Sequence, residues 1–195
     1  RSERTLTPAV VTRGFGRNTA FAPTLDDEVY GQALYLPQRT VAGARHDVLF
    51  VATQRNSIYA LDADTGRSLW NTNLGTAVMR AQQSCGNVNR IGVLGTPVID
   101  EAAGTLYAVS FVSESSGLAF KLNALDVATG TQRSGYPVAL SPPTTNGSSF
   151  DTRTTGQRGA LALRDGRVFV AFGGLYGDCG IYHGWVVGVD TARPT

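Results

Sequence analysis

The chain has 195 residues, of which 42% are hydrophobic, and its formal net charge is +2. This length and apolar content predict a globular protein with a hydrophobic core and exclude a disordered polar chain. The small charge, without a clustered basic run, excludes a nucleic-acid-binding surface. No window reaches the roughly 18 consecutive apolar residues of a membrane span. Residues 1–4 lack the apolar core of a signal peptide, so we expect any export signal to have been removed already.

Glycine is abundant, with 23 residues, and strand-forming residues are plentiful. Runs with helical period are absent, so the sequence predicts an all-β fold. The first stretch in chain order, residues 5–22, has β character without a pattern that recurs.

Four strand-like runs follow, at residues 31–36, 47–52, 56–62 and 68–74. The last two flank a turn in which an aspartate bonds its own backbone and a glycine tolerates a positive φ. Trp70, in the fourth run, is large enough to anchor this hairpin against a neighbouring sheet.

This unit recurs along the chain. Asp62, Asp126 and Asp190 are evenly spaced in the sequence, and each follows a strand-like run. Three glycines that open the first run of each unit keep the same spacing: Gly31, Gly95 and Gly159. The middle runs, at 47–52, 105–110 and 167–172, do not keep the period, because the loops around them differ in length. Repeats tolerate such loop variation.

Repeated four-stranded antiparallel units predict a β-propeller, in which each blade buries one face against the next. A β-sandwich of about twelve strands is the competing architecture. We expect an N-terminal segment (1–30), blade 1 (31–94), blade 2 (95–158) and blade 3 (159–195), which lacks its outer strand. Because propellers need roughly 4 to 8 blades, about three blades leave the ring incomplete.

Two explanations remain for the open ring. A longer parent protein, which we favour, would supply more blades, and residues 10–21 could then be the closing strand of the last one. Alternatively, another copy or another chain completes the ring.

The first turn unit resembles the tryptophan-docking motif of the PQQ-like repeat β-propeller family. The pattern places Ala60, Asp62, Thr65, Gly66 and Trp70 at the positions of that motif. The second repeat keeps only part of it, with Asp126 and Gly130 and a tyrosine near the tryptophan position, and the third ends after Asp190. The resemblance covers roughly residues 30 to 190 and implies secreted bacterial relatives.

The resemblance gives these residues a structural role, with the aspartate accepting turn hydrogen bonds and the tryptophan lying between blades. Family members that are dehydrogenases hold pyrroloquinoline quinone (PQQ) near a calcium ion and a catalytic aspartate, often under a vicinal cysteine pair. This chain has no such pair and no acid that matches the catalytic one. Many members are scaffolds, so we expect no cofactor, with PQQ and calcium as the alternative, and no catalytic residue.

The resemblance also assigns the long loops. In propellers of this connectivity, the loops at residues 76–94, 141–158 and 173–184 emerge on one face, which is called here the loop face. Cys85 and Cys179 both lie in these loops, so we expect them to form a disulfide, the alternative being two separate thiols. A disulfide indicates a secreted or periplasmic location.

Four polar residues are further candidates for the loop face. Asp178 and His183, beside Cys179, could act as metal ligands, although a hydrogen-bonded histidine next to a disulfide is the simpler interpretation. Asp26 and Asp27 could hold a cation or a basic partner, or form a solvated loop. We expect no metal site.

The function expected from the sequence is a non-catalytic binding or scaffolding module with a protein or a carbohydrate on its loop face. Two alternatives stay open. One is part of a PQQ-dependent dehydrogenase that oxidises an alcohol or a sugar, and the other is a structural protein whose ring another chain completes.

Overall fold

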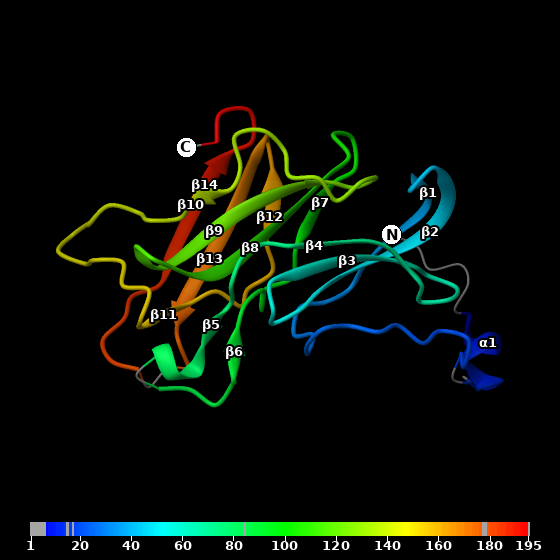
Figure 1. Cartoon of the computed structure of the whole chain (residues 1–195), viewed down its shortest axis with the longest axis horizontal. Coiled ribbons are helices and arrows are strands. Elements are labelled where there is room, and N and C mark those ends of the chain that lie inside the picture. The colour runs from blue at the N-terminus through cyan, green and yellow to red at the C-terminus, as the bar shows by residue number, and fades with distance from the viewer. Residues whose placement is uncertain (1–6, 15, 17, 84, 177–178, 195) are drawn as a thin grey trace.

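The computed structural model describes residues 7–14, 16, 18–83, 85–176 and 179–194. Within this part, three four-stranded antiparallel sheets and a two-stranded ribbon follow one short α-helix. The sheets do not close into a ring (Figure 1). The predicted all-β fold, a partial propeller of four-stranded blades, is confirmed. No helix in the described part of the chain is long and apolar enough to cross a membrane.

Blade 1 is the sheet of four consecutive strands, paired in sequence order. These are β1 (Leu34–Val41), β2 (Ala44–Ala52), β3 (Ser57–Asp62) and β4 (Ser68–Asn73). The first two strands are longer than predicted, because residues 39–41 pair with 44–46 after a register shift that follows Leu36. A turn with positive φ at Ala42 and Gly43 joins them. The connection between the first two predicted runs of blade 1 is therefore a β-hairpin.

Blades 2 and 3 repeat this arrangement. Blade 2 contains β7 (Val98–Asp100), β8 (Thr105–Glu114), β9 (Gly117–Asp126) and β10 (Val138–Ala139). Blade 3 contains β12 (Ala162–Arg164), β13 (Arg167–Gly174) and β14 (Trp185–Asp190), and the short strand β11 (Thr155–Gly156) pairs with the end of β13. No described strand occupies the outer position after β14.

Smaller elements lie in the loops. The ribbon of β5 (Val78–Met79) and β6 (Arg90–Ile91), with the 3-10 helix η1 (Arg80–Gln82) between its strands, lies in the loop that links blades 1 and 2. This loop packs on blade 2, because Ala77 bridges to Val112 of β8.

The closing strand expected over residues 10–21 is absent from the described part of this segment. Helix α1 (Pro8–Thr12) forms instead, because the Thr7 side chain caps the Val10 amide and proline fits the first helical turn. The chain then crosses the β3–β4 turn, where the Ala22 amide donates to the Thr65 carbonyl. The N-terminal segment thus covers the outer side of blade 1 without joining its sheet.

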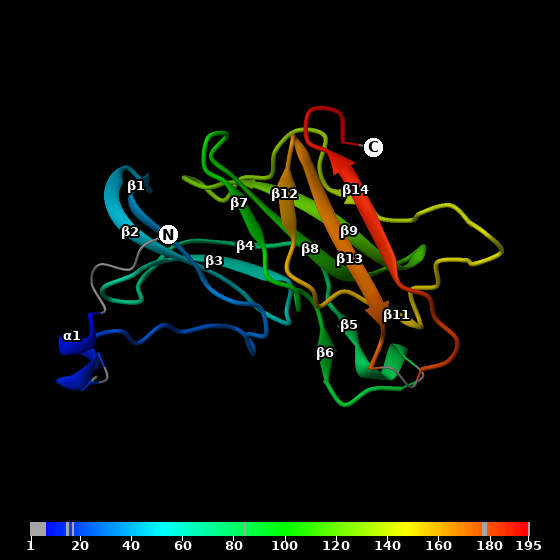
Figure 2. The same cartoon turned by 180° about the vertical axis from the view of Figure 1, so that it is seen from behind.

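The core consists of layers between neighbouring blades. Figures 1 and 2 show the sheet β1–β4 and the sheet β12–β14 on opposite sides of the sheet β7–β10. Side chains of Phe50, Ile58 and Leu106 belong to the cluster between blades 1 and 2. Phe111 and Val170 belong to the cluster between blades 2 and 3. Burial of these apolar faces is the main force that holds the blades together.

The three evenly spaced glycines meet at the inner ends of the blades. A Cβ atom on Gly31 would lie 2.9 Å from the Gly95 carbonyl oxygen, and one on Gly95 would lie 2.7 Å from the Gly159 carbonyl oxygen. The Gln32 amide also donates to the Thr96 hydroxyl at 2.9 Å. The period therefore marks a place where adjacent backbones touch and no side chain fits.

Candidate functional site

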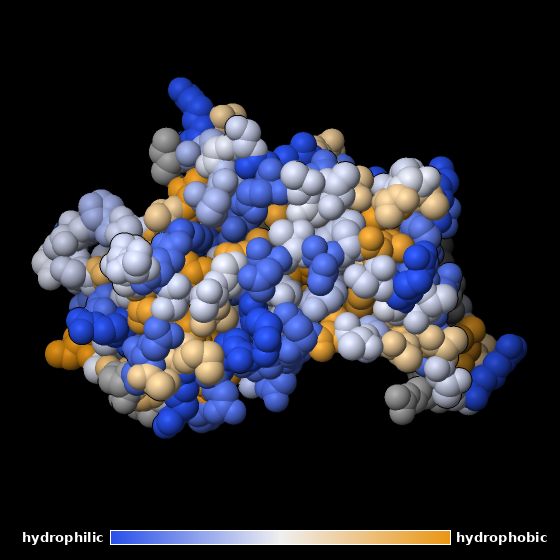
Figure 3. All heavy atoms as spheres, in the orientation of Figure 1, coloured by the Kyte–Doolittle hydropathy of each residue, from blue (hydrophilic) through white to orange (hydrophobic). Residues whose placement is uncertain are grey.

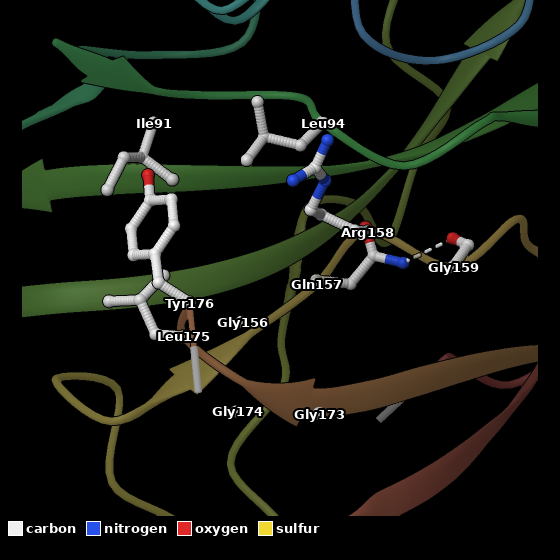
Figure 4. Close-up of a pocket in the computed structure, with 10 residues that line it drawn as sticks. All are labelled: Ile91, Leu94, Gly156, Gln157, Arg158, Gly159, Gly173, Gly174, Leu175 and Tyr176. Carbon is white, nitrogen blue, oxygen red and sulfur yellow. Dashed lines mark hydrogen bonds between the residues drawn. The ribbon is translucent and has the colours of Figure 1, made fainter. Parts of the chain in front are cut away.

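The three long loops converge on one hollow of about 300 Å³ (Figure 4). Ile91 and Leu94 come from the end of the first loop, residues 156–159 from the end of the second and residues 173–176 from the start of the third. The β5–η1–β6 loop and the loop after β13 lie together at the lower end of the sheets in Figure 1, away from the turn after β14. The grouping of these loops on one face agrees with the sequence prediction.

The walls of this hollow are largely apolar. Ile91, Leu94 and Leu175 are all buried. In Figure 4, Tyr176 and Ile91 stand on one side, Arg158 and Gln157 on the other, and the glycines of the β13 end lie below them. A concave apolar surface with a few polar groups is the usual form of a binding site.

A single guanidinium group supplies charge to the lining. Arg158 is exposed, lies 5.2 Å from the centre of the Tyr30 ring and forms no ion pair with a described carboxylate. Burial raises the pKa of Tyr176, and the positive charges of Arg158 and Arg80 act against this rise. The neighbouring Gln157 is buried and donates to the Gly159 carbonyl at 2.7 Å, which fixes the backbone beneath the arginine.

The disulfide between Cys85 and Cys179 is present, with its Cα atoms 5.3 Å apart and a sequence separation of 94. It ties the first loop to the third, next to the hollow. Gly86, which follows the first cysteine, packs so closely that a Cβ atom there would lie 2.5 Å from the Tyr176 ring. The disulfide therefore holds together two of the loops that form the lining.

The other predicted candidates do not gather at this hollow. The Asp26 carboxylate accepts bonds from the Thr53 hydroxyl at 2.8 Å and the Ser57 hydroxyl at 2.6 Å. Asp27 forms an ion pair with Arg90. These acids secure the N-terminal segment to blade 1 and its loop.

His183 is exposed and forms no hydrogen bond with a described residue, and Asp178 lies outside the described residues. Among the described residues, no three His, Cys, Asp or Glu side chains gather as a possible metal site. The histidine next to the disulfide is therefore not seen as part of a ligand set.

The repeat-motif residues take structural positions on the opposite face. Asp62 accepts from the Thr65 amide at 3.0 Å and the Thr65 hydroxyl at 2.7 Å. Asp126 and Asp190 accept from the backbone amides of their own turns in the same way. The indole of Trp70 donates to the Val127 carbonyl at 3.0 Å, across the boundary between blades 1 and 2.

Sequence reasoning missed the residues that surround the hollow, although the repeat contained a signal for them. Tyr30, Leu94 and Arg158 each immediately precede one of the three evenly spaced glycines. Because those glycines meet at the inner ends of the blades, the residues before them are brought together on the loop face.

Comparisons with known proteins agree with this architecture. Residues 16–110 match the model of the family described as outer membrane protein assembly factor BamB. No curated protein matches the chain.

Three solved structures are similar to the chain. A quinohemoprotein alcohol dehydrogenase from Comamonas testosteroni is 19% identical with a TM-score of 0.51, over 85% of this chain and 20% of that one. BamB from Moraxella catarrhalis is 15% identical with a TM-score of 0.46, over 87% of this chain and 52% of that one. The quinohemoprotein alcohol dehydrogenase ADHIIG from Pseudomonas putida HK5 is 12% identical with a TM-score of 0.38, over 72% of this chain and 33% of that one.

The chain thus spans about a fifth of the first structure and about half of the second. The first likeness shows the fold alone. The family match covers the first repeat with its docking motif, and the three sheets stack as propeller blades. The chain therefore resembles the PQQ-like repeat β-propeller family, and the family match covers residues 16–110.

Proposed function

We propose that this chain is a portion of a propeller that acts as a non-catalytic binding or scaffolding module, with a partner on its loop face. The observation that carries this proposal is the set of exposed apolar side chains around the hollow. Ile181 is 90% exposed, Tyr182 43% and Tyr30 41%. Apolar atoms also protrude at the lower left of Figure 3, over the loop that follows β13. Exposed apolar groups beside a hollow are typical of interaction sites.

The chemistry of the hollow favours a protein over a carbohydrate as the partner. Its apolar walls suit an aliphatic or aromatic side chain, and Arg158 suits a carboxylate beside it. The matching family is named for an outer membrane protein assembly factor, which also supports a protein partner. The disulfide supports a secreted or periplasmic location.

Binding to proteins of a bacterial cell-envelope extract tests the proposal. The full chain would be immobilised and the bound proteins identified by mass spectrometry. We expect Ile181→Asp and Arg158→Glu to abolish capture of a specific partner, because they place charge on the apolar rim and reverse the charge of the lining. The matched control is Val11→Asp, which changes an exposed apolar residue of α1, 46% exposed. Capture that survives Ile181→Asp, or that is lost with Val11→Asp, contradicts the loop-face site.

The alternative function is part of a dehydrogenase that uses PQQ and calcium to oxidise an alcohol or a sugar. The donor set for the ion is the relevant observation, because calcium requires several carboxylate or carbonyl oxygens. The described residues contain no cluster of three potential ligands, and Arg158 is the only cationic side chain in the described lining. In this alternative, blades outside this chain would hold the quinone and its ion. Addition of PQQ and Ca²⁺, followed by absorbance and dye-linked alcohol oxidation, tests this alternative, which saturable turnover would support.

A further blade is proposed to cover blade 3, as in the structural-protein alternative. Val186 is 73% exposed and pairs with Ala171, whereas Leu122 of blade 2, in the matching register, is completely buried. A second copy of the chain is the occupant that can be tested directly, by the solution mass of the chain with and without Val186→Asp. A concentration-dependent increase in mass that the substitution removes supports this proposal, and a monomer at all concentrations argues against the second copy.

A further inference from the structure

The loop between β10 and β11 contains a pair of residues that can react with each other. It spans residues 140–154, and in Figures 1 and 2 its outer part projects away from the three sheets. Of the asparagines in the chain, only Asn146 precedes a glycine, Gly147. The backbone nitrogen of the next residue can attack the side-chain amide of an asparagine. Glycine hinders this attack least, because it has no Cβ atom.

The outer part of this loop is anchored to the core at both ends. Leu140 is buried, and its amide donates to a backbone carbonyl of β9 at 2.8 Å. At the other end, the centre of the Phe150 ring lies 5.1 Å from that of the Phe172 ring. Residues 141–149 lie between these anchors, and each of them is at least partly exposed. A chemical change in this stretch is therefore separated from the packing between the blades.

Asn146 and Gly147 form a two-residue turn at the tip of the loop. On either side of it, the backbones of Thr145 and Ser148 pair through two hydrogen bonds of 3.0 and 2.9 Å. The φ angle is 51° at Asn146 and 76° at Gly147. Asn-Gly is a preferred sequence for turns with positive φ at both central residues. Since the pairing is exposed and short, the turn can open locally without disturbing the sheets.

The two groups that would react have no other contacts in the described part of the chain. No described residue forms a hydrogen bond with the Asn146 side chain or with the Gly147 amide. Both residues are exposed, and a Cβ atom on Gly147 would have no neighbour within 4 Å. Neither packing nor hydrogen bonding therefore keeps the Gly147 nitrogen away from the Asn146 side chain.

Asn56 is the protected counterpart of Asn146. It also has a positive φ, 63°, but it is completely buried. Its Nδ2 atom donates to the Phe111 carbonyl at 2.9 Å and to the Gly75 carbonyl at 3.2 Å. The fold therefore shields Asn56 and leaves Asn146 open to reaction.

We propose that Asn146 is a site of spontaneous deamidation in the folded chain. The Gly147 nitrogen forms a bond to Cγ of Asn146 while the bond from Cγ to Nδ2 breaks, and ammonia leaves with the proton of the Gly147 amide. Solvent water then opens the succinimide ring at either carbonyl group, which gives aspartate or isoaspartate. The reaction needs no oxidant and no enzyme.

The modification changes the charge and the backbone of the loop. The formal net charge of +2 falls by one unit, because a neutral amide becomes a carboxylate. Isoaspartate also adds a methylene group to the main chain, so the pairing of Thr145 with Ser148 should be lost. Because Leu140 and Phe150 anchor the loop outside this turn, we expect the blades to keep their packing. The modification does not depend on a loop-face partner.

Incubation of the folded chain at mildly alkaline pH, followed by tryptic peptide mapping, tests the proposal. Cleavage after Arg133 and Arg153 gives a peptide with no other asparagine and no glutamine. We expect this peptide to gain about 1 Da and to separate into aspartate and isoaspartate forms. Its rate should exceed that of every other asparagine by about tenfold or more. It should also lie within about tenfold of the rate in the urea-unfolded chain, and a digest before incubation gives the background.

Two variants identify the reacting groups. Asn146→Gln should abolish the gain in mass, because its side chain would have to close a larger ring. Gly147→Ala should slow the gain about tenfold or more, since a Cβ atom hinders the nitrogen. The matched control is Gly43→Ala, at a turn glycine with a φ of 83° and no neighbour within 4 Å, and it should leave the rate unchanged.

Three results would each overturn the proposal. The first is an unmodified Asn146 in the folded chain under conditions in which the unfolded chain reacts. The second is an equal rate at Asn146 and Asn56, and the third is an unchanged rate in Gly147→Ala. Urea denaturation of each variant checks that it is folded, so that a change in rate reports on the turn alone.

Discussion

The boundary between blades 1 and 2 and the boundary between blades 2 and 3 bury similar layers of apolar side chains but are fastened differently. Trp70 spans the first, on the face of the tight turns, where its indole bonds the Val127 carbonyl. At the second, Tyr136 leaves a hollow on that face. There the disulfide of Cys85 and Cys179 joins a loop packed on blade 2 to a loop of blade 3, on the loop face.

The difference shows that the repeat determines the register of the strands, whereas the contacts that join neighbouring blades vary. Phe50 with Ala60 and Tyr107 with Ala124 hold the same positions in their sheets. The residue near the tryptophan position and the cysteines of the loops decide whether a boundary is closed by packing or by a covalent bond. Substitutions of Trp70 and of the two cysteines therefore measure how much each contact contributes to the stability of its boundary.

Removal of the disulfide should have the largest effect on stability. For Cys85→Ala with Cys179→Ala, the loop-entropy model predicts a loss of about 4.7 kcal/mol in the free energy of unfolding, because the bond joins residues with a sequence separation of 94. Urea denaturation followed by circular dichroism measures this loss. A reductant should destabilise the wild type and leave the double variant unchanged. Equal stability of the two proteins would show that the second boundary holds without its covalent bond.

Truncation of the indole should have the next largest effect. Trp70→Ala removes packing against Phe50 and the hydrogen bond to Val127, so we expect a loss of about 3 kcal/mol. Tyr136→Ala, at the second boundary, should cost less, because the hollow there already reduces packing. The same urea measurement compares the two variants. A larger loss for Tyr136→Ala would reverse the assignment of the first boundary as the one closed by packing.

Two glycine substitutions separate the steric clash with the Trp70 indole from the cost of a positive φ angle. Gly130 and Gly166 have nearly equal positive φ values, 72° and 70°. A Cβ atom on Gly130 would collide with Trp70, whereas the nearest atom for Gly166 is 3.9 Å away. We expect Gly166→Ala to cost about 1 kcal/mol from backbone strain alone, and Gly130→Ala about 2 to 3 kcal/mol. Equal losses would mean that the indole moves aside freely.

Much of the fold could be predicted from the sequence, because the determining signals are local. The aspartate turns and the inner glycines recur with one constant spacing, and each has one physical role. The hairpin of β1 and β2 escaped prediction, since its polar, exposed residues do not alternate with apolar ones. In this chain, Thr7 and Pro8 start a short helix that reaches into residues 10–21, and a closing strand there in a longer parent protein stays a prediction.

The candidate site was less accessible to sequence reasoning. The pairing of Cys85 and Cys179 followed from loop positions alone, once the connectivity of the blades was assumed. Asp26 and Asp27 were expected to hold a cation or a basic partner, or to form a solvated loop, whereas both bond within the chain, to partners 31 and 63 residues away. Such pairings depend on how the N-terminal segment lies across blade 1, and no local pattern specifies that path.

Substitution of a turn aspartate should give the smallest change in the free energy of unfolding. The change in its pH dependence should appear only at acidic pH. Hydrogen bonds from Thr65 and His46 lower the pKa of Asp62 to about 2. Since this folded-state pKa lies below the unfolded value of 3.8, the stability it contributes is present above about pH 4 and is lost as the pH falls towards 2. The Asp62 side chain is 15% exposed, and we expect a contribution of about 1 kcal/mol.

Asp62→Asn should therefore reduce stability at pH 7 and flatten its dependence on pH between 4 and 2, which urea midpoints at several pH values would show. Asp190 is the matched control at the third turn, where the amides of Ala192 and Arg193 lower its pKa without a histidine. His46→Ala separates the two contributions at Asp62: it should weaken the acid dependence of the first turn and leave that of Asp190 unchanged. If His46→Ala had no effect, the Thr65 hydrogen bonds alone would hold the first turn, and the turns on the two sides of blade 2 would be equivalent.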